Sequence, residues 1–268
     1  MFLTRALTVL IALPIFAAAL LLLPQSQWAL VLMPGLFIAA WEWGGLAQYG
    51  STSRLVYGAF VVVSAGTIQY LTPVAGTGAP LDVWAYALSV AFWVAVAPFW
   101  LLARWTIRHP VVLGVAGWIA LVPMWLALVR LQPTPWALLL FMSIVWIADT
   151  AAYAAGRQWG RHKLAPLISP GKSWEGVAGA VVALGVYYLI LWFAVPAGER
   201  FFPAAIGLVV FAGILALSIE GDLFESWMKR QAGLKDSGQL LPGHGGILDR
   251  IDGLTSTMPA AALALYLL

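Results

Sequence analysis

The chain has no cysteine and very little charge. Charged residues make up 9% of its 268 residues and hydrophobic residues 62%, whereas charged residues are roughly a quarter of a typical soluble domain. The lack of cysteine excludes a disulfide framework, a thiolate nucleophile and cysteine-ligated zinc or iron–sulfur centres. A metal would therefore need oxygen ligands or one of the 3 histidines. The scarcity of charge excludes a soluble fold, because the many apolar helices would have no polar face for water.

Basic residues exceed acidic ones, with a formal net charge of +3 and a pI of about 9.3. The 14 Lys and Arg residues are spread over many loops, so they form no basic stripe that could follow nucleic-acid phosphates. We therefore expect no nucleic-acid partner. The partner that the composition indicates is the lipid bilayer.

Long apolar runs recur along the whole chain, separated by polar or Pro- and Gly-rich breaks. They predict an all-α fold, a polytopic transmembrane helical bundle that forms one membrane domain over 1–268. Residues 1–130 have only a loose helical pattern, whereas 135–268 also carry the polar motifs. The expected spans, about nine, are 5–23, 28–48, 55–71, 83–102, 111–129, 135–155, 174–194, 203–221 and 254–268.

The distribution of basic residues predicts how these spans are oriented. If the N-terminus is cytoplasmic, only Arg130 and Arg200 of the 14 basic residues fall outside, as the positive-inside rule requires. This orientation places both long polar segments, 156–173 and 221–253, in the cytoplasm. Nucleotide substrates would be available there.

Acidic residues are concentrated in the second of these segments. Six of the 11 are Glu220, Asp222, Glu225, Asp236, Asp249 and Asp252. If the eighth span continues as a helix past residue 221, a carboxylate, a hydroxyl and two cations share one face of it, since 222, 226, 229 and 230 lie at i, i+4, i+7 and i+8. Asp249 and Asp252 have the same i, i+3 relation at the start of the ninth helix. Such a cluster can also be an ordinary solvated loop.

Carboxylates mixed with lysine and arginine, without cysteine, suit a hard cation that holds a phosphate-rich substrate. The glycines around His244 add a backbone that can approach an anion closely. We expect His244 to contact the ligand without transferring a proton. The pattern as a whole predicts phosphoryl or nucleotidyl transfer, in which the protein mostly positions groups and neutralises charge.

The segment from Ser226 to Asp252 resembles the signature of phosphatidate cytidylyltransferases, also called CDP-diacylglycerol synthases. It contains, in order, a serine, a Lys-Arg pair, a Lys-Asp pair, His-Gly-Gly, an Asp-Arg pair and a final aspartate. The stretches from Asp149 to Lys163 and from Ser169 to Gly176 are similar to two further segments of that family. In the last of them Gly171 stands where the family has a lysine, and a serine replaces its threonine.

The resemblance implies that CTP and phosphatidic acid react to give CDP-diacylglycerol and pyrophosphate. It also implies Mg²⁺, with room for a second cation, a homodimer, and the inner membrane of a bacterium with the active site on the cytoplasmic side. Asp222 and Asp249 are the expected metal ligands and, with Lys229, the expected catalytic residues. A salt bridge to Lys229 or Arg250 is the alternative for the two aspartates. The other expected substrate-binding residues are Ser226, Arg230, Lys235, Asp236, His244, Gly245, Gly246, Arg250, Asp252, Asp149, Ser169, Lys172 and Ser173.

Several roles stay open at this point. Asp149, Tyr153 and Arg157 form a stripe that should face the bundle interior, where Asp149 serves either in the site or in a buried pair with Arg157. Ser173 is expected to cap the helix that follows it, whose N-terminus could hold a phosphate. Glu42, between two tryptophans in the second span, has no motif support.

Two other functions compete with this interpretation. A CTP-dependent polyprenol or lipid kinase would use similar residues but would release CDP. A proton-coupled transporter would use the acids within the spans, but such proteins usually show paired inverted repeats, and the sequence shows none.

Overall fold

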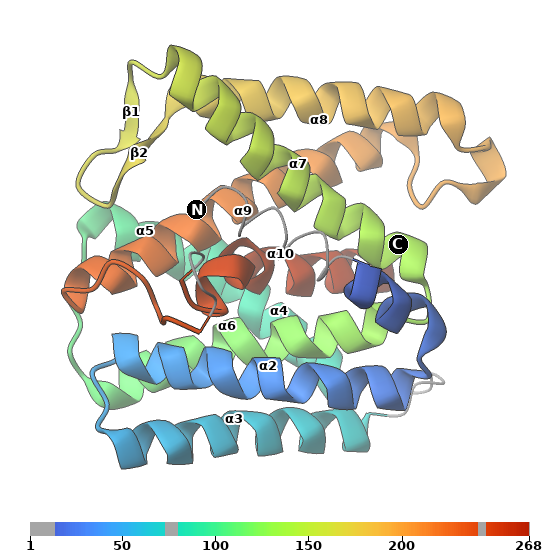
Figure 1. Ribbon diagram of the computed structural model, residues 1–268. Coiled ribbons are helices and arrows are strands. Elements are labelled where there is room, and N and C mark those ends of the chain that lie inside the picture. Colours follow the sequence, from blue (N-terminus) through green and yellow to red (C-terminus); the bar gives the residue numbers. More distant parts are fainter. Residues whose placement is uncertain (1–13, 73–79, 241–244, 268) are drawn as a thin grey trace.

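The computed structural model describes residues 14–72, 80–240 and 245–267, and the predicted helical character is confirmed over them (Figure 1). A helix covers 14–22. The helices after it are α2 (Gln25–Leu46), α3 (Ser51–Leu71), α4 (Leu81–Ala91), the π-helical turn η1 (Phe92–Val96), α5 (Ala97–Ala103), α6 (Pro110–Leu131), α7 (Pro135–Trp159), α8 (Trp174–Ala194), the 3-10 turn η2 (Ala197–Glu199), α9 (Ala204–Gln231) and α10 (Leu248–Leu267).

Within the described residues, 7 helices are long and apolar enough to cross a membrane. They are α2, α3, the continuous stretch from α4 to α5, α6, α7, α8 and α9. Each coincides with one of the expected spans. The first expected span, 5–23, is described only from residue 14, where a helix covers 14–22, and the ninth, 254–268, lies in α10, which is not among the 7. Over the described residues the structure thus supports a polytopic helical bundle in which 7 of the nine expected spans are represented.

Helix α10 lies in the middle of the bundle, where it packs against α9, α6, α4 and α7 (Figure 1). Its buried face includes Leu254, Met258 and Ala261. The buried hydroxyls of the same helix are satisfied by backbone carbonyls: Ser256 Oγ donates to Leu217 O at 2.7 Å and Thr257 Oγ1 to Gly253 O at 2.7 Å. Because neighbouring helices surround it, α10 does not need the uniformly apolar surface of a lipid-facing span.

The polar segment 156–173 departs from the predicted all-α fold. It contains a short antiparallel hairpin of β1 (Lys163–Ala165) and β2 (Ser169–Ser173), with Lys163 opposite Ser173. Pro166 and Pro170 lack the backbone N–H that a helix needs, and the ladder pairs backbone groups that would otherwise have no partner. The hairpin reverses the chain between α7 and α8, which lie side by side.

Helix α9 also extends beyond the predicted span 203–221 and ends at Gln231. It crosses α10 at Gly221, where a Cβ atom would lie 2.6 Å from both Asp252 O and Ser256 Oγ. Only glycine allows the two helices to approach so closely, and this approach brings the polar end of α9 beside the start of α10.

Replacement of Gly221 by alanine should therefore destabilise the protein, by about 1–3 kcal/mol for an overpacked contact, and lower its activity with it. Gly213→Ala on the same helix is the matched control, because no atom lies within 4 Å of the added methyl group there. Thermal unfolding of both variants in the same detergent checks the prediction. Equal melting temperatures for the two variants would contradict it.

Candidate active site

The polar end of α9 carries the carboxylate, hydroxyl and cations that the sequence predicts on one helical face. Because the helix continues to Gln231, Asp222 and Ser226 lie one turn apart, and Ser226 Oγ donates a hydrogen bond of 3.3 Å to Asp222 Oδ1. Lys229 follows on the same side. The condition on which the shared face depends, a helix that continues past residue 221, is met.

Asp222 is paired with a lysine from another element. Lys172, near the end of β2, places its Nζ 2.7 Å from Asp222 Oδ2 and 3.3 Å from the carbonyl oxygen of Ile219. This first lysine–carboxylate pair joins the hairpin to α9. The predicted site residues Lys172 and Asp222 are therefore brought together across 50 positions of sequence.

A second lysine–carboxylate pair joins α9 to α10. Lys229 Nζ lies 2.6 Å from Asp249 Oδ1 and 2.5 Å from Glu225 Oε2. The other oxygen of Asp249 accepts three hydrogen bonds, from the N–H of Ser237 at 3.0 Å, its hydroxyl at 3.0 Å and the N–H of Gly246 at 2.8 Å. Burial would raise the pKa of Asp249, but Lys229 and these donors outweigh it and hold the pKa below its ordinary value.

Asp252 is coupled to both pairs. It interacts electrostatically with Asp222 of the first pair, with Lys229 of the second and with Asp149. Burial and the neighbouring Asp222 raise the pKa of Asp252 above its ordinary value. The two pairs, Lys172–Asp222 and Lys229–Asp249, therefore belong with Asp252 and Asp149 to one charged cluster.

Glu42 is the residue that the motifs missed. Its side chain, only 5% exposed, accepts hydrogen bonds from the N–H groups of Ile247 at 3.1 Å and Leu248 at 2.8 Å, and from the hydroxyl of Ser237 at 3.1 Å. It thus caps the N-terminus of α10 from α2, and Ser237 links it to Asp249. The sequence does contain a signal for this role, because Glu42 is a charged residue within an apolar span. A buried carboxylate needs hydrogen-bond partners.

Gly238 and Gly246 leave the space that Glu42 occupies. A Cβ atom at either position would collide with its carboxylate. Gly246 was expected to bind substrate through its N–H, but that N–H donates to Asp249. Gly245 has a positive φ of 82°, so it supplies the left-handed turn before α10 that glycine adopts most easily.

The start of α8 is built as the sequence predicts. Ser173 Oγ accepts a hydrogen bond of 3.2 Å from the N–H of Gly176 and caps the helix. Glu175 in the first turn accepts hydrogen bonds from the N–H groups of Arg161 and His162, which holds the hairpin against α8. Arg230 reaches the same hairpin, since its Nε donates to Ile168 O at 3.2 Å.

The stripe of Asp149, Tyr153 and Arg157 is oriented differently from the prediction, which placed it in the bundle interior. Tyr153 is 68% exposed, and Arg157 donates to its hydroxyl at 3.3 Å. Asp149 instead interacts electrostatically with Asp222, Lys172 and Arg250. The stripe faces outward because the buried side of α7 is occupied by Phe141, Ile144 and Ala148 and their neighbours.

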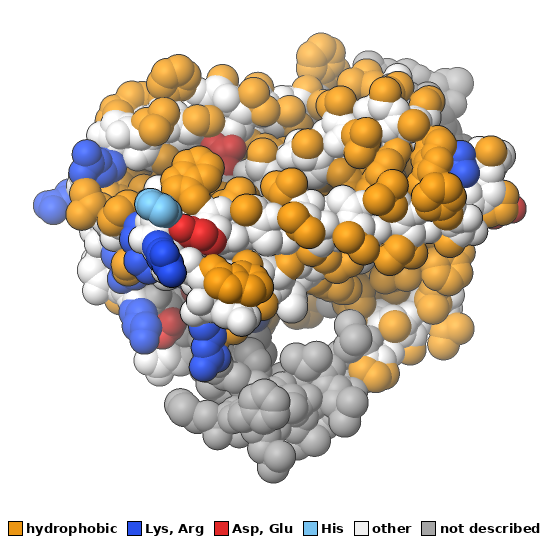
Figure 2. Space-filling view, turned by 90° about the horizontal axis from the view of Figure 1, so that it is seen from above, with side chains coloured by type: hydrophobic (Ala, Val, Ile, Leu, Met, Phe, Trp, Pro, Cys, Tyr) orange, Lys and Arg blue, Asp and Glu red, His pale blue; other side chains and the backbone are white. Residues whose placement is uncertain are grey.

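Most of the remaining predicted residues are exposed. Lys235, Asp236 and Arg250 are exposed, and Ser169 is half-buried in β2. His244 lies outside the described residues. Figure 2 shows Lys and Arg side chains gathered at the end of the molecule where β1 and β2 lie, while most of the visible face is hydrophobic.

The described residues contain no group of three or more His, Asp or Glu side chains arranged as a finished metal cage. Their chemistry still fits a hard cation. Asp222, Asp252 and Asp149 offer only oxygen donors, and they repel one another at a partly buried place, so a bound cation would relieve the repulsion. Asp249 differs, because both of its oxygens already accept hydrogen bonds.

Comparison with known proteins identifies the class. The chain belongs to the Cytidylyltransferase family, whose pattern it matches over residues 3–268. It is 38% identical over 288 residues to a phosphatidate cytidylyltransferase of Pseudomonas aeruginosa, an alignment that covers 98% of this chain and 96% of that protein.

Two further relatives match parts of the chain. A phosphatidate cytidylyltransferase of Haemophilus influenzae is 50% identical over 126 residues, which is 46% of this chain and 43% of that protein. One of Brucella suis is 42% identical over 183 residues, 67% of this chain and 64% of that protein.

Proposed function

We propose that this protein transfers the cytidylyl group of CTP to phosphatidate and so forms CDP-diacylglycerol and pyrophosphate. The observation that carries the proposal is the charged cluster at the meeting point of α7, β2, α9 and α10, in a chain whose described part contains 7 helices long and apolar enough to cross a membrane. The relatives of the chain bear the name of this activity. Such a cluster suits a reaction between two polyanions at a lipid surface.

The reaction needs no residue that abstracts a proton. Phosphatidate carries an ionised phosphate at neutral pH, and one of its oxygens attacks the α-phosphorus of CTP. The bond between the α-phosphorus and its bridging oxygen breaks, and pyrophosphate leaves. The work of the protein is to align the two phosphates and to reduce their repulsion. Lys172 and Lys229 are placed for this, since each holds a carboxylate that a substrate phosphate can replace.

A divalent cation, Mg²⁺, belongs to the proposal. Asp222 and Asp249 are its proposed ligands, with Asp252 close to both lysine–carboxylate pairs and able to complete the donor set. When bound, the ion would neutralise charge on the CTP phosphates. Asp249 would have to release Lys229, which frees that ammonium group for substrate phosphate.

We further propose a multi-pass protein of the bacterial inner membrane, with the charged cluster on the cytoplasmic side, where CTP is available. The distribution of Lys and Arg supports this orientation. A homodimer is also part of the proposal. Only 11% of the most apolar stretch of α8 is buried within the chain. This helix therefore offers a long apolar face to lipid or to a second copy of the protein.

Purified protein in detergent, given CTP, phosphatidate and Mg²⁺, is expected to release pyrophosphate and form CDP-diacylglycerol in equal amounts. Chelation of the metal should reduce the rate to background, and excess Mg²⁺ should restore it. Omission of phosphatidate is the control for hydrolysis of CTP. Full turnover in the presence of the chelator would contradict the metal assignment, and no CDP-diacylglycerol under any condition would contradict the function.

A further inference from the structure

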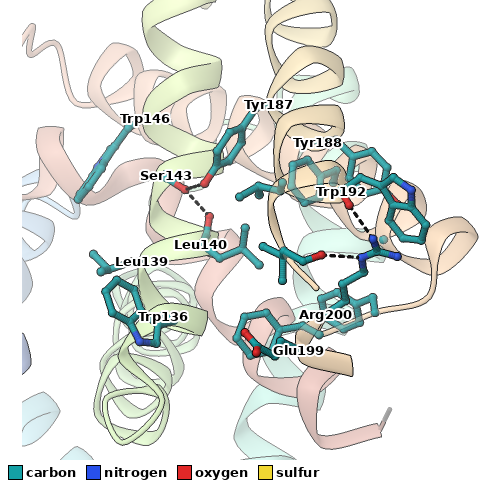
Figure 3. A pocket seen from close by; sticks show the side chains of 16 residues that line it. Trp136, Leu139, Leu140, Ser143, Trp146, Tyr187, Tyr188, Trp192, Glu199 and Arg200 are labelled. Carbon is teal, nitrogen blue, oxygen red and sulfur yellow. Dashed lines mark hydrogen bonds between the residues drawn. The ribbon is translucent and has the colours of Figure 1, made fainter. Parts of the chain in front are cut away.

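A cavity of about 890 Å³ lies between α7, α8, η2 and α9, outside the charged cluster (Figure 3). Its walls include Leu139, Leu140 and Trp146 of α7, Tyr188 of α8 and Phe211 of α9. This volume is within the range of roughly 300–1,000 Å³ that small-molecule sites have. The size and the concave shape indicate a ligand rather than a flat contact surface.

Several polar groups of the cavity, other than Glu199, form hydrogen bonds within the protein itself. Ser143 Oγ donates to Leu140 O at 2.7 Å and lies 2.8 Å from the hydroxyl of Tyr187. At the far end Arg200 donates to the carbonyl oxygens of Trp192 at 2.7 Å and Val195 at 3.1 Å (Figure 3). The other walls are largely aromatic or aliphatic. Such a lining suits a hydrocarbon chain, which has no hydrogen-bond donor or acceptor.

Helix α7, which lines the cavity, leads to the charged cluster. Leu139, Ser143 and Trp146 recur at helical spacing on the cavity side, and Asp149 lies in the next turn, about a quarter turn around the helix from them. Asp149 interacts electrostatically with Asp222 and Lys172. The ten residues from Asp149 to Leu139 span about 15 Å of helix, close to half of the roughly 30 Å hydrocarbon thickness of a bilayer. An acyl chain that starts at the cluster and extends about 15 Å toward the outer ends of these helices can therefore reach the cavity.

We infer that this cavity binds an acyl chain of the phosphatidate whose phosphate lies at Lys172 and Asp222. The inference rests on the proposed function and adds a determinant of chain length to it. An acyl chain is favoured over a second copy of the protein because the cavity is walled by three helices of one chain, two of which, α7 and α9, also carry residues of the charged cluster. Phe211 and Tyr188 close its inner wall.

Leu139→Trp fills the cavity about 15 Å from Asp149 along the helix, beyond the reach of a short chain. The variant should lower kcat/KM for dipalmitoyl phosphatidate roughly tenfold, the cost of displacing about two buried methylene groups. The value for dioctanoyl phosphatidate should change less than twofold. Leu189→Trp is the matched control, since Leu189 is exposed on α8 and does not line the cavity. It should leave the ratio of the two values unchanged.

Leu139→Ala removes the contact with the acyl chain without adding volume. It should also lower the ratio of kcat/KM for dipalmitoyl phosphatidate to that for dioctanoyl phosphatidate. This variant keeps the test decisive if Leu139→Trp does not fold. Ratios within twofold of wild type for both Leu139 variants would overturn the inference. So would a change in oligomeric state of Leu139→Trp with an unchanged ratio, which would assign the surface to a second copy. Failure of the wild type to convert either phosphatidate would instead contradict the proposed function.

Discussion

Replacing Asp222 by asparagine is expected to lower CDP-diacylglycerol formation by roughly a hundredfold or more, as the loss of a charge that positions reacting phosphates commonly does. Asparagine keeps the shape of the side chain and can still accept the hydrogen bond from Ser226. It removes the negative charge that pairs with Lys172 at 2.7 Å and that we assign to the cation. The rate is measured at saturating CTP and Mg²⁺ on purified protein.

The melting temperature of Asp222→Asn should stay close to that of the wild type, because the side chain of Asp222 is 34% exposed and such pairs add little stability. Asp249→Asn should abolish activity as well, but with a lower melting temperature, since the carboxylate of Asp249 holds Lys229, Ser237 and Gly246. Near-normal turnover of folded Asp222→Asn would remove this residue from the site.

Replacing Glu42 by alanine is expected to lower both stability and activity, although Glu42 belongs to none of the motifs. The change leaves the N–H groups of Ile247 and Leu248 without their acceptor, and each unsatisfied buried group costs about 1–3 kcal/mol. Because Ser237 contacts both Glu42 and Asp249, the start of α10 should loosen. We expect a fall in melting temperature and, at temperatures where the variant is still folded, a rate at least roughly tenfold lower.

Glu42→Gln is the informative companion variant. Its amide oxygen can still accept from one of the two N–H groups, so it should retain more stability and activity than Glu42→Ala. Equal activity of Glu42→Ala and the wild type, measured on folded protein, would show that α10 keeps its position without this cap.

Local features of the site could be predicted from the sequence. The continuation of α9, the shared face of Asp222 and Ser226, the cap at Ser173 and the start of α10 near Asp249 all follow from spacing within one segment. The resemblance to phosphatidate cytidylyltransferases rests on the same segments. These predictions depend on neighbours a few residues away, where periodicity and capping rules apply.

Features that depend on distant parts of the chain could not be predicted. Glu42 accepts a hydrogen bond from Leu248, which is 206 positions away in the sequence. No local sequence pattern predicts that contact. The central place of α10 follows from its packing against α9, α6, α4 and α7, while its own sequence suggested an ordinary short span. Asp149 and Tyr153 face outward because the opposite face of α7 packs into the core. That choice of face also depends on distant parts of the chain.

The position of a label on CTP tests the central claim most directly. With purified protein, phosphatidate and Mg²⁺, a label on the α-phosphate of CTP should appear in the lipid product, and a label on the γ-phosphate should appear only in pyrophosphate. Transfer of the γ-label to a lipid, with release of CDP, would show that the charged cluster serves a lipid kinase and would contradict the account.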